Sequence, residues 1–174
     1  MINGGCGGVG TFAIQMARSF GAEITAVDST EKLDMMRALG AAHVIDYTKE
    51  DFTRRGNCYD LIVDVKSNRS ILDYKRALRP NGVYATVGGN TASILQLALL
   101  DPLIGKKENK SLTLVMHRPN KDLEALCDLF ESGNVKPVID RCFPLGETEE
   151  AFRHFGEGHF KGKVVITVAQ ENHP

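Results

Sequence analysis

A glycine-rich stretch near the start of the chain has the composition of a phosphate-binding turn: Gly4-Gly5-Cys6-Gly7-Gly8-Val9-Gly10. Within it, Gly5, Gly7 and Gly10 satisfy the G-x-G-x-x-G pattern, which lets the backbone turn sharply and lets a pyrophosphate approach it closely. A helical pattern follows, so a helix N-terminus would present free N–H groups and a partial positive charge to the phosphates. The stretch therefore predicts a dinucleotide-binding turn.

An acidic residue supports this interpretation, because the glycine pattern alone could arise by chance in a chain with 17 glycines. Asp28 follows a short apolar run, 18 positions beyond Gly10, where a carboxylate would accept hydrogen bonds from the adenosine ribose. Such a carboxylate favours NAD, whereas Ser29 and Lys32 could hold the 2′-phosphate of NADP. The plainer roles are a helix cap for Ser29 and a solvated surface position for Lys32. These three residues do not decide whether the cofactor is NAD or NADP.

Other chemistries are less well supported. Binding of S-adenosylmethionine uses a similar glycine turn and acidic residue, and it stays a competing hypothesis. Cys6 lies at the start of the predicted helix, where a thiolate is stabilised, but we favour the role of a small residue that fits the turn. The spacing of Cys and His residues is not typical of a zinc site, and no His pairs with Ser or Cys as in a triad. We therefore assign no metal ligand and no catalytic residue.

Strand-like and helix-like segments alternate along the first two thirds of the chain. Strands are expected at residues 24–27, 43–46, 61–63, 83–87 and 112–115, and helices at 12–20, 33–39 and 71–78. A turn is expected at Pro80-Asn81-Gly82, and the apolar stretch 95–104 could be a helix or a lid. This alternation predicts an α/β fold with a doubly wound parallel sheet, the Rossmann arrangement. Only three residues precede the glycines, so the first strand is expected to be cut short.

The pattern of strand-like and helix-like segments changes after residue 116. A helix is expected at 123–130, strands at 138–143 and 164–168, a short helix at 151–155, and a frayed polar tail at 170–174. We therefore divide the chain into a dinucleotide-binding domain, 1–116, and a C-terminal segment, 117–174.

The composition of the chain bears on two kinds of binding partner, nucleic acid and the lipid bilayer. The net charge of −1 gives no electrostatic case for nucleic acid, and no apolar run is long enough to span a bilayer. The chain lacks the pattern of a secretory signal, and its four cysteines are expected to be reduced thiols, so a cytoplasmic protein is predicted.

Several blocks resemble the medium-chain dehydrogenase/reductases, most closely their quinone oxidoreductase-like branch. Residues 3–15 resemble that family's N-G-A-S-G-G-V-G turn, and Leu39-Gly40-Ala41-Ala42-His43-Val44-Ile45-Asp46-Tyr47 resembles its L-G-A-D-x-V-I-D-Y block. Residues 78–88 match its fifth-strand unit, and 135–140 and 158–166 match its C-terminal hallmarks. The resemblance covers nearly the whole chain.

The resemblance implies a small-molecule substrate: hydride is transferred, usually from NADPH, to a quinone, enone or related carbonyl. It implies that Cys6, Gly7, Gly8 and Val9 contact the phosphates, and that Tyr47 lies near the adenosine end. Ser29 matches a position that holds the 2′-phosphate, as Lys32 does in some members, and residues 159–161 match a stretch that can reach the cofactor. The nicotinamide is expected at the carboxyl ends of the strands, near Val65, Val87 and Gly88. Relatives pair through the edge strand at 112–115, which predicts a homodimer.

Two departures from the family pattern shape the functional hypothesis. Asp28 stands where many NADPH-using relatives have a small residue. The family's GroES-like portion is absent from this sequence, and residues 117–174 resemble the part that returns to it, so apolar surface is expected to be exposed. We therefore predict the cofactor-binding part of an NAD(P)H-dependent oxidoreductase, inactive in isolation. The alternative is a non-catalytic dinucleotide-binding module, either truncated or sensing.

Overall fold

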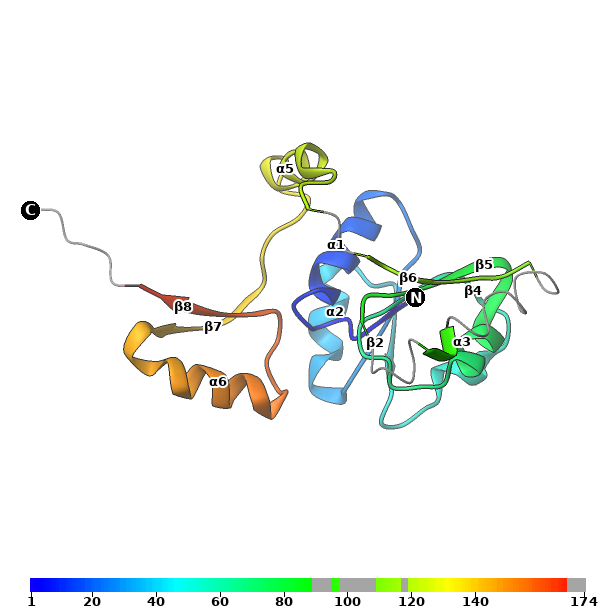
Figure 1. Ribbon diagram of the computed structural model, residues 1–174, viewed down its shortest axis with the longest axis horizontal. Helices are drawn as coiled ribbons and strands as arrows, with labels where there is room; N and C mark the ends of the chain where they lie inside the picture. Colours follow the sequence, from blue (N-terminus) through cyan, green and yellow to red (C-terminus); the bar gives the residue numbers. More distant parts are fainter. Residues whose placement is uncertain (89–94, 98–108, 117–118, 169–174) are drawn as a thin grey trace, which may run out of the picture.

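A computed structural model describes residues 1–88, 95–97, 109–116 and 119–168 (Figure 1). Six parallel strands form one sheet in the order β3-β2-β1-β4-β5-β6. The strands are β1 (Ile2–Asn3), β2 (Thr25–Asp28), β3 (His43–Asp46), β4 (Tyr59–Asp64), β5 (Leu78–Thr86) and β6 (Ser111–Leu114). Strand order reverses direction between β1 and β4, which places a switch point beside the glycine turn. The predicted α/β fold with a doubly wound parallel sheet is confirmed.

Two hydrophobic clusters cover the faces of this sheet. Helices α1 (Gly10–Ser19) and α2 (Leu33–Leu39) contribute Ile14 and Met36, both fully buried, to one cluster. Helix α3 (Ile71–Ala77) contributes Tyr74 to the other, where its ring stacks on that of Tyr84 from β5. Short 3₁₀ turns, η1 (Thr30–Lys32) and η2 (Phe52–Arg55), follow β2 and β3. The glycine turn therefore joins a central strand to a helix packed on one face.

The largest local difference from expectation lies in β5. This strand begins at Leu78, whereas the sequence predicted a turn at residues 80–82 and a strand only from Val83. Tyr59 pairs with Leu78 and Leu61 with Val83, so the residues between Leu78 and Val83 bulge out of the strand. Asn81 has a φ of 64° in this bulge. The predicted turn is present, but it interrupts a strand instead of preceding one.

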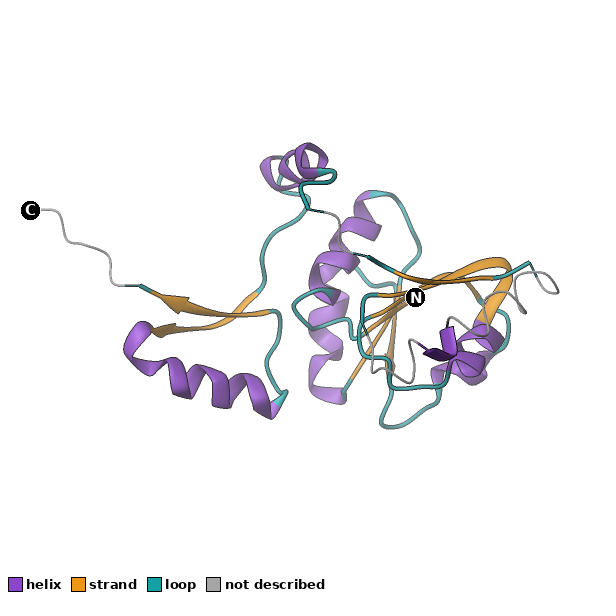
Figure 2. Cartoon of the chain, in the orientation of Figure 1, coloured by secondary structure: helices purple, strands orange, loops and turns teal. Residues whose placement is uncertain are grey.

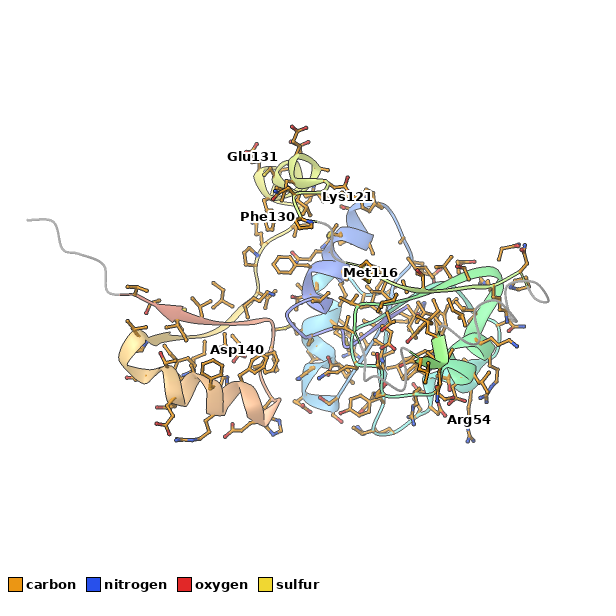
Figure 3. All side chains as sticks on the ribbon, viewed as in Figure 1. Arg54, Met116, Lys121, Phe130, Glu131 and Asp140 are labelled. Carbon is orange, nitrogen blue, oxygen red and sulfur yellow. The ribbon has the colours of Figure 1, made fainter. Side chains whose placement is uncertain are left out.

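The C-terminal residues form a separate small sheet (Figure 2). Strands β7 (Ile139–Pro144) and β8 (Lys163–Thr167) pair in parallel, joined through η3 (Leu145–Glu147) and α6 (Thr148–Glu157). Helix α6 is ten residues long, longer than the short helix that the sequence predicted at 151–155. Helix α5 (Leu123–Glu131) precedes this unit, and Phe130, labelled in Figure 3, brings its ring to 6.0 Å from Phe12 of α1.

The C-terminal unit exposes apolar side chains, as expected. Phe152 is 69% exposed and Phe155 53% exposed, and both line a small apolar groove with Ala151, Val164 and Ile166. The expected helix or lid at 95–104 lies outside the described residues from 98 onward, and so does the expected frayed tail. No helix in the described part of the chain combines the length and apolar character needed to cross a bilayer.

Candidate dinucleotide-binding site

The glycine turn is held tightly between β1 and α1. The backbone N–H groups of Gly4 and Gly5 both donate to Val27 O, at 2.9 and 3.1 Å. Gly4 has a φ of 85°, a conformation that side chains with a Cβ rarely adopt. A Cβ added to Gly10 would lie 2.0 Å from Gly4 O, so only glycine fits where the helix meets the turn. A Cβ added to Gly5, the first glycine of the pattern, would lie 2.5 Å from Met36 Sδ, so packing within the chain favours glycine at both ends of the pattern, Gly5 and Gly10.

Gly7 differs from these glycines, because nothing in the turn requires it. A Cβ added there would lie 3.5 Å from its nearest neighbour, Gly4 O, which is an ordinary contact, and its φ is not in the left-handed region. Gly7 and Gly8 are half-buried, and Val9 is 41% exposed. The lack of a side chain at this half-buried position just before a helix would let a pyrophosphate approach the backbone closely. The turn thus fits the phosphates of a dinucleotide.

Asp28 lies against the turn, at the carboxyl end of β2. Its Oδ2 accepts a hydrogen bond from the backbone N–H of Cys6 at 2.9 Å, and its Oδ1 accepts one from the N–H of Ser29 at 3.0 Å. The residue is 3% exposed. A carboxylate in this position braces the turn, because it holds the loop after β1 to the loop after β2.

Lys32 is buried, so the plainer interpretation of a solvated surface lysine is wrong. Its side chain is 5% exposed, and its Nζ donates to the carbonyl oxygen of Gly158 at 2.9 Å. The same ammonium lies 3.8 Å from Asp28 Oδ1 and 5.6 Å from the centre of the Phe160 ring. The C-terminal segment covers this side chain, which sequence periodicity within 30–40 could not show.

Ser29 occupies the cap position of η1 but does not cap it with its side chain. Its Oγ donates instead to Glu31 Oε1 at 2.5 Å, and this hydrogen bond lowers the pKa of Glu31. The helix-cap interpretation of Ser29 is therefore wrong. The sequence analysis did not predict a role for Glu31. Its position two residues after Ser29 was the signal that could have indicated this contact.

Tyr47 lies beside Asp28 at the ends of neighbouring strands. Its backbone N–H donates to Asp28 O at 3.2 Å, and its side chain is 39% exposed. The preceding residue, Asp46, accepts hydrogen bonds from the hydroxyls of Thr30 and Thr48, which hold its pKa well below its usual range. Asp46 thus fixes the loops after β2 and β3 to each other.

Cys6 is fully buried, and its Sγ donates to Lys32 O at 3.3 Å. Burial, reinforced by the carboxylate of Asp28, raises the pKa of its thiol to about 12. A thiol in this state is not a reactive thiolate. The favoured role, a small residue that fits the turn, agrees with this burial.

The residues expected near the nicotinamide come together where β4 and β5 end. The backbone N–H of Val65 donates to Asn3 O at 3.1 Å, and that of Val87 donates to Asp64 O at 2.9 Å. Gly88 follows directly, and its carbonyl oxygen accepts from Ser67 Oγ at 3.1 Å. The three predicted residues therefore lie at one edge of the sheet, beside the switch point.

A buried polar network underlies this edge, and sequence reasoning missed it. Asn3 Nδ2 donates to Asp64 Oδ1 at 2.9 Å and to the hydroxyl of Tyr74 at 3.0 Å, while the hydroxyl of Tyr84 donates to Asp64 Oδ2 at 2.7 Å. Burial raises the pKa of both tyrosines, so both stay protonated. Asp64 also accepts from the backbone N–H of Ser67, which orders the loop after β4. The available signal was a polar residue at the end of each apolar strand.

The segment at residues 158–163 lies on the turn. The backbone N–H of Gly162 donates to Cys6 O at 2.8 Å. Lys161 N–H donates at 3.0 Å to Asp140, a β7 residue labelled in Figure 3, which also contacts His154 Nε2 at 2.7 Å. Gly162 thus joins this segment to the turn, and the expectation that residues 159–161 reach the cofactor stays a prediction.

The fold defines an α/β unit of the Rossmann type, and comparison with known proteins identifies its family. A model of the zinc-binding dehydrogenase family matches residues 39–166. The chain belongs to this family, and its resemblance to quinone oxidoreductase-like medium-chain dehydrogenase/reductases is confirmed. Its relatives include proteins named as NAD(P)H oxidoreductases and quinone oxidoreductases.

Three similar proteins illustrate the relationship. The zinc-type alcohol dehydrogenase-like protein of Schizosaccharomyces pombe is 31% identical over 95% of this chain and 50% of its own. The mitochondrial NAD(P)H oxidoreductase RTN4IP1 of Mus musculus is 31% identical over 97% of this chain and 47% of its own. The quinone oxidoreductase structure from Coxiella burnetii has a TM-score of 0.81 and 26% identity, covering 97% of this chain and 52% of its own. The chain therefore spans about half the length of the relatives it matches.

The family description mentions zinc, and the described residues do not fit a zinc site. No group of three or more His, Cys, Asp or Glu side chains in the described ranges could hold a metal ion.

Proposed function

We propose that this chain binds NAD or NADP at its glycine turn and forms the cofactor-binding part of an oxidoreductase that reduces a quinone, enone or related carbonyl. The observation that carries the proposal is Gly7, a half-buried glycine between β1 and α1 that packing within the chain does not require. Gly5, Cys6, Gly7, Gly8, Val9 and Gly10 would hold the pyrophosphate. Bound nicotinamide would supply the hydride, and the chain would orient it.

The adenosine end would rest on the loops after β2 and β3. Asp28, Ser29, Lys32 and Tyr47 gather there, beside Glu31. Val65, Val87 and Gly88 would face the nicotinamide from the ends of β4 and β5. The two groups flank the turn, as a dinucleotide that crosses the switch point requires.

Calorimetric titration of the 174-residue chain with NADH and NADPH tests this proposal. The variant Gly7→Ala is expected to fold normally and to bind both dinucleotides at least tenfold more weakly, since its methyl group would occupy the path of the pyrophosphate. Gly146→Ala is the matched control, because a Cβ there meets nothing within 4 Å. Absence of binding by the unmodified chain, or tighter binding of S-adenosylmethionine, would contradict the proposal.

A second candidate is a non-catalytic dinucleotide-binding module. The exposed Phe152 and Phe155, in a chain half the length of its relatives, favour it for the isolated polypeptide. A quinone reductase assay on the 174-residue chain separates the two. We expect dinucleotide binding without turnover, and turnover by this chain alone would exclude the module.

We also propose that the chain forms a homodimer through β6. This strand is the edge of the six-stranded sheet, and Val115 and Met116 beyond it are 49% and 70% exposed. Analytical ultracentrifugation should show a dimer, and replacement of Leu114 by Pro should dissociate it. The N–H of Val115 donates to Thr86 O in β5, so the N–H of Leu114, one position earlier, faces the edge of the sheet, where proline could not donate to a partner strand. A monomer at high concentration would contradict this proposal.

A cytoplasmic location is part of the same proposal. Four cysteines without a disulfide in the structure support it. Relatives named for mitochondria and chloroplasts make cell fractionation the direct test.

A further inference from the structure

One lysine of the C-terminal unit lies on the glycine turn, and the proposed function gives it no role. Lys163 is the first residue of β8. Its Nζ lies 3.0 Å, and its Cδ 3.2 Å, from the position that a Cβ on Gly8 would occupy. The ammonium group therefore lies against the backbone of the turn, close to where α1 begins.

The backbone that carries Lys163 is fixed on two sides. The N–H of Gly162 donates to Cys6 O at 2.8 Å, and the N–H of Lys163 donates to Val138 O at 2.8 Å. Gly162 has a φ of 89°, and a Cβ there would lie 2.3 Å from Val138 O, so this close approach requires glycine. The position of Lys163 on the turn is thus set by the packing of the C-terminal segment.

The ammonium group of Lys163 has an incomplete set of partners. Within the described ranges, neither a hydrogen bond nor an ion pair engages its Nζ, and its contact is with the ring of Phe12, whose centre is 5.5 Å away. A ring face attracts a cation but does not replace an anionic acceptor. Lys32 differs, because it already donates to Gly158 O and lies near Asp28. The exposed side chain of Lys163 can therefore bind an anion.

The turn beside this ammonium group also offers backbone donors. The N–H of Thr11 donates to Gly7 O at 3.1 Å, whereas the N–H groups of Gly8 and Val9 have no acceptor in the part of the chain that the structure describes. Free N–H groups ahead of a helix carry partial positive charge. The ammonium and these N–H groups are all donors, so the ligand that satisfies them together is an anion with several oxygen atoms.

We propose that Lys163 binds the pyrophosphate of the dinucleotide, as a cation that the C-terminal unit supplies to the glycine turn. This inference rests on the proposed function, because it assigns one more residue to the same site. Lysine binds phosphate groups as a compact point charge. The pyrophosphate is common to NAD and NADP, so Lys163 contributes equally to the affinity for each. The C-terminal unit is then part of the cofactor site.

Calorimetric titration of Lys163→Met with NADH and NADPH tests the inference. Methionine keeps an apolar stem beside Phe12 and removes the charge, so both dinucleotides should bind about tenfold more weakly, with an unchanged ratio of the two affinities. Lys163→Arg should recover most of the affinity, because it restores a cation. Lys121→Met is the control, since that side chain is 59% exposed and lies just before α5 (Figure 3). Circular dichroism checks that each variant is folded.

Chemical protection gives a second readout, which does not depend on a variant. Brief acetylation of the unmodified chain, followed by mass spectrometry, measures the reactivity of each exposed lysine. Saturating NADH should slow acetylation of Lys163 at least threefold, and so should inorganic pyrophosphate, which carries neither adenosine nor nicotinamide. Acetylation of Lys121 should not change with either probe.

The outcomes separate this inference from the proposed function. Unchanged binding of both dinucleotides by Lys163→Met, or acetylation of Lys163 that neither probe slows, would overturn the inference and leave the proposed function standing. A loss confined to NADPH would also overturn it, because Lys163 would then contact the 2′-phosphate. Absence of dinucleotide binding by the unmodified chain would contradict the proposed function and this inference together.

Discussion

The ammonium group of Lys32 donates a 2.9 Å hydrogen bond to the carbonyl oxygen of Gly158, 126 positions later in the chain. The same group lies 3.8 Å from Asp28, whose carboxylate holds the backbone of Cys6. One buried side chain thus links the C-terminal segment to the turn that would hold the phosphates. A buried ammonium group needs hydrogen-bond and charge partners, and those of Lys32 come from residues far apart in the sequence.

Replacing Lys32 should release the C-terminal segment. Lys32→Met keeps the apolar stem but removes the donor to Gly158, so we expect a loss of about 1–3 kcal/mol of stability. Amide hydrogens at 158–163 should exchange faster. Lys49→Met is the control, because the Lys49 side chain is 67% exposed. Unchanged exchange at 158–163 would show that other contacts hold the segment.

Glu31 should set the preference between the two dinucleotides. Its carboxylate bonds to Ser29, the residue expected to meet a 2′-phosphate, and like charges repel. Glu31→Gln should therefore improve NADPH binding relative to NADH by about threefold to tenfold in calorimetric titration. Glu124→Gln on α5 serves as the control. An unchanged ratio would place the discrimination elsewhere, without affecting the binding proposal itself.

The network beneath the nicotinamide edge should contribute to stability. Tyr84→Phe removes the 2.7 Å hydrogen bond to Asp64 and leaves a buried carboxylate with one donor fewer. Urea unfolding should show a loss of about 1.5–3 kcal/mol, the range for hydrogen bonds to charged groups. Tyr47→Phe, at a side chain 39% exposed, should change stability by less than about 0.5 kcal/mol. Equal losses from both variants would contradict this account.

Stability should depend on the protonation of Met1. Burial lowers the pKa of its amino group from 8.0 to about 6, so between these values the unfolded chain binds more protons than the folded chain. The contribution of this group to the free energy of unfolding therefore rises from pH 6 to pH 8, by on the order of 2 kcal/mol. Comparison with the N-terminally acetylated chain isolates the effect. A constant difference between the two chains across this window would refute it.

Much of the framework follows from local sequence. Gly4 and Gly10 are required by the backbone of the turn itself, and Gly40 ends α2 with a φ of 111°. Alternation of strand and helix patterns predicted the sheet, because each pattern buries one face against its neighbours. The carboxyl ends of parallel strands meet at one edge, so the gathering of Asp28 and Val65 near the turn was predictable.

The burial of polar groups was decided only by tertiary structure. Asn3 and Asp64 are 61 positions apart, and no local pattern shows that they pair. Lys32 carries the sequence signature of a surface residue, yet a segment more than 120 positions away covers it. The periodicity of a sequence indicates which face of a helix or strand is apolar. The partner of a buried charge is instead determined by which distant segment packs against it in the folded chain. The sequence by itself determined the turn and the order of elements, and the packing of the C-terminal segment decided which side chains remain available to a cofactor.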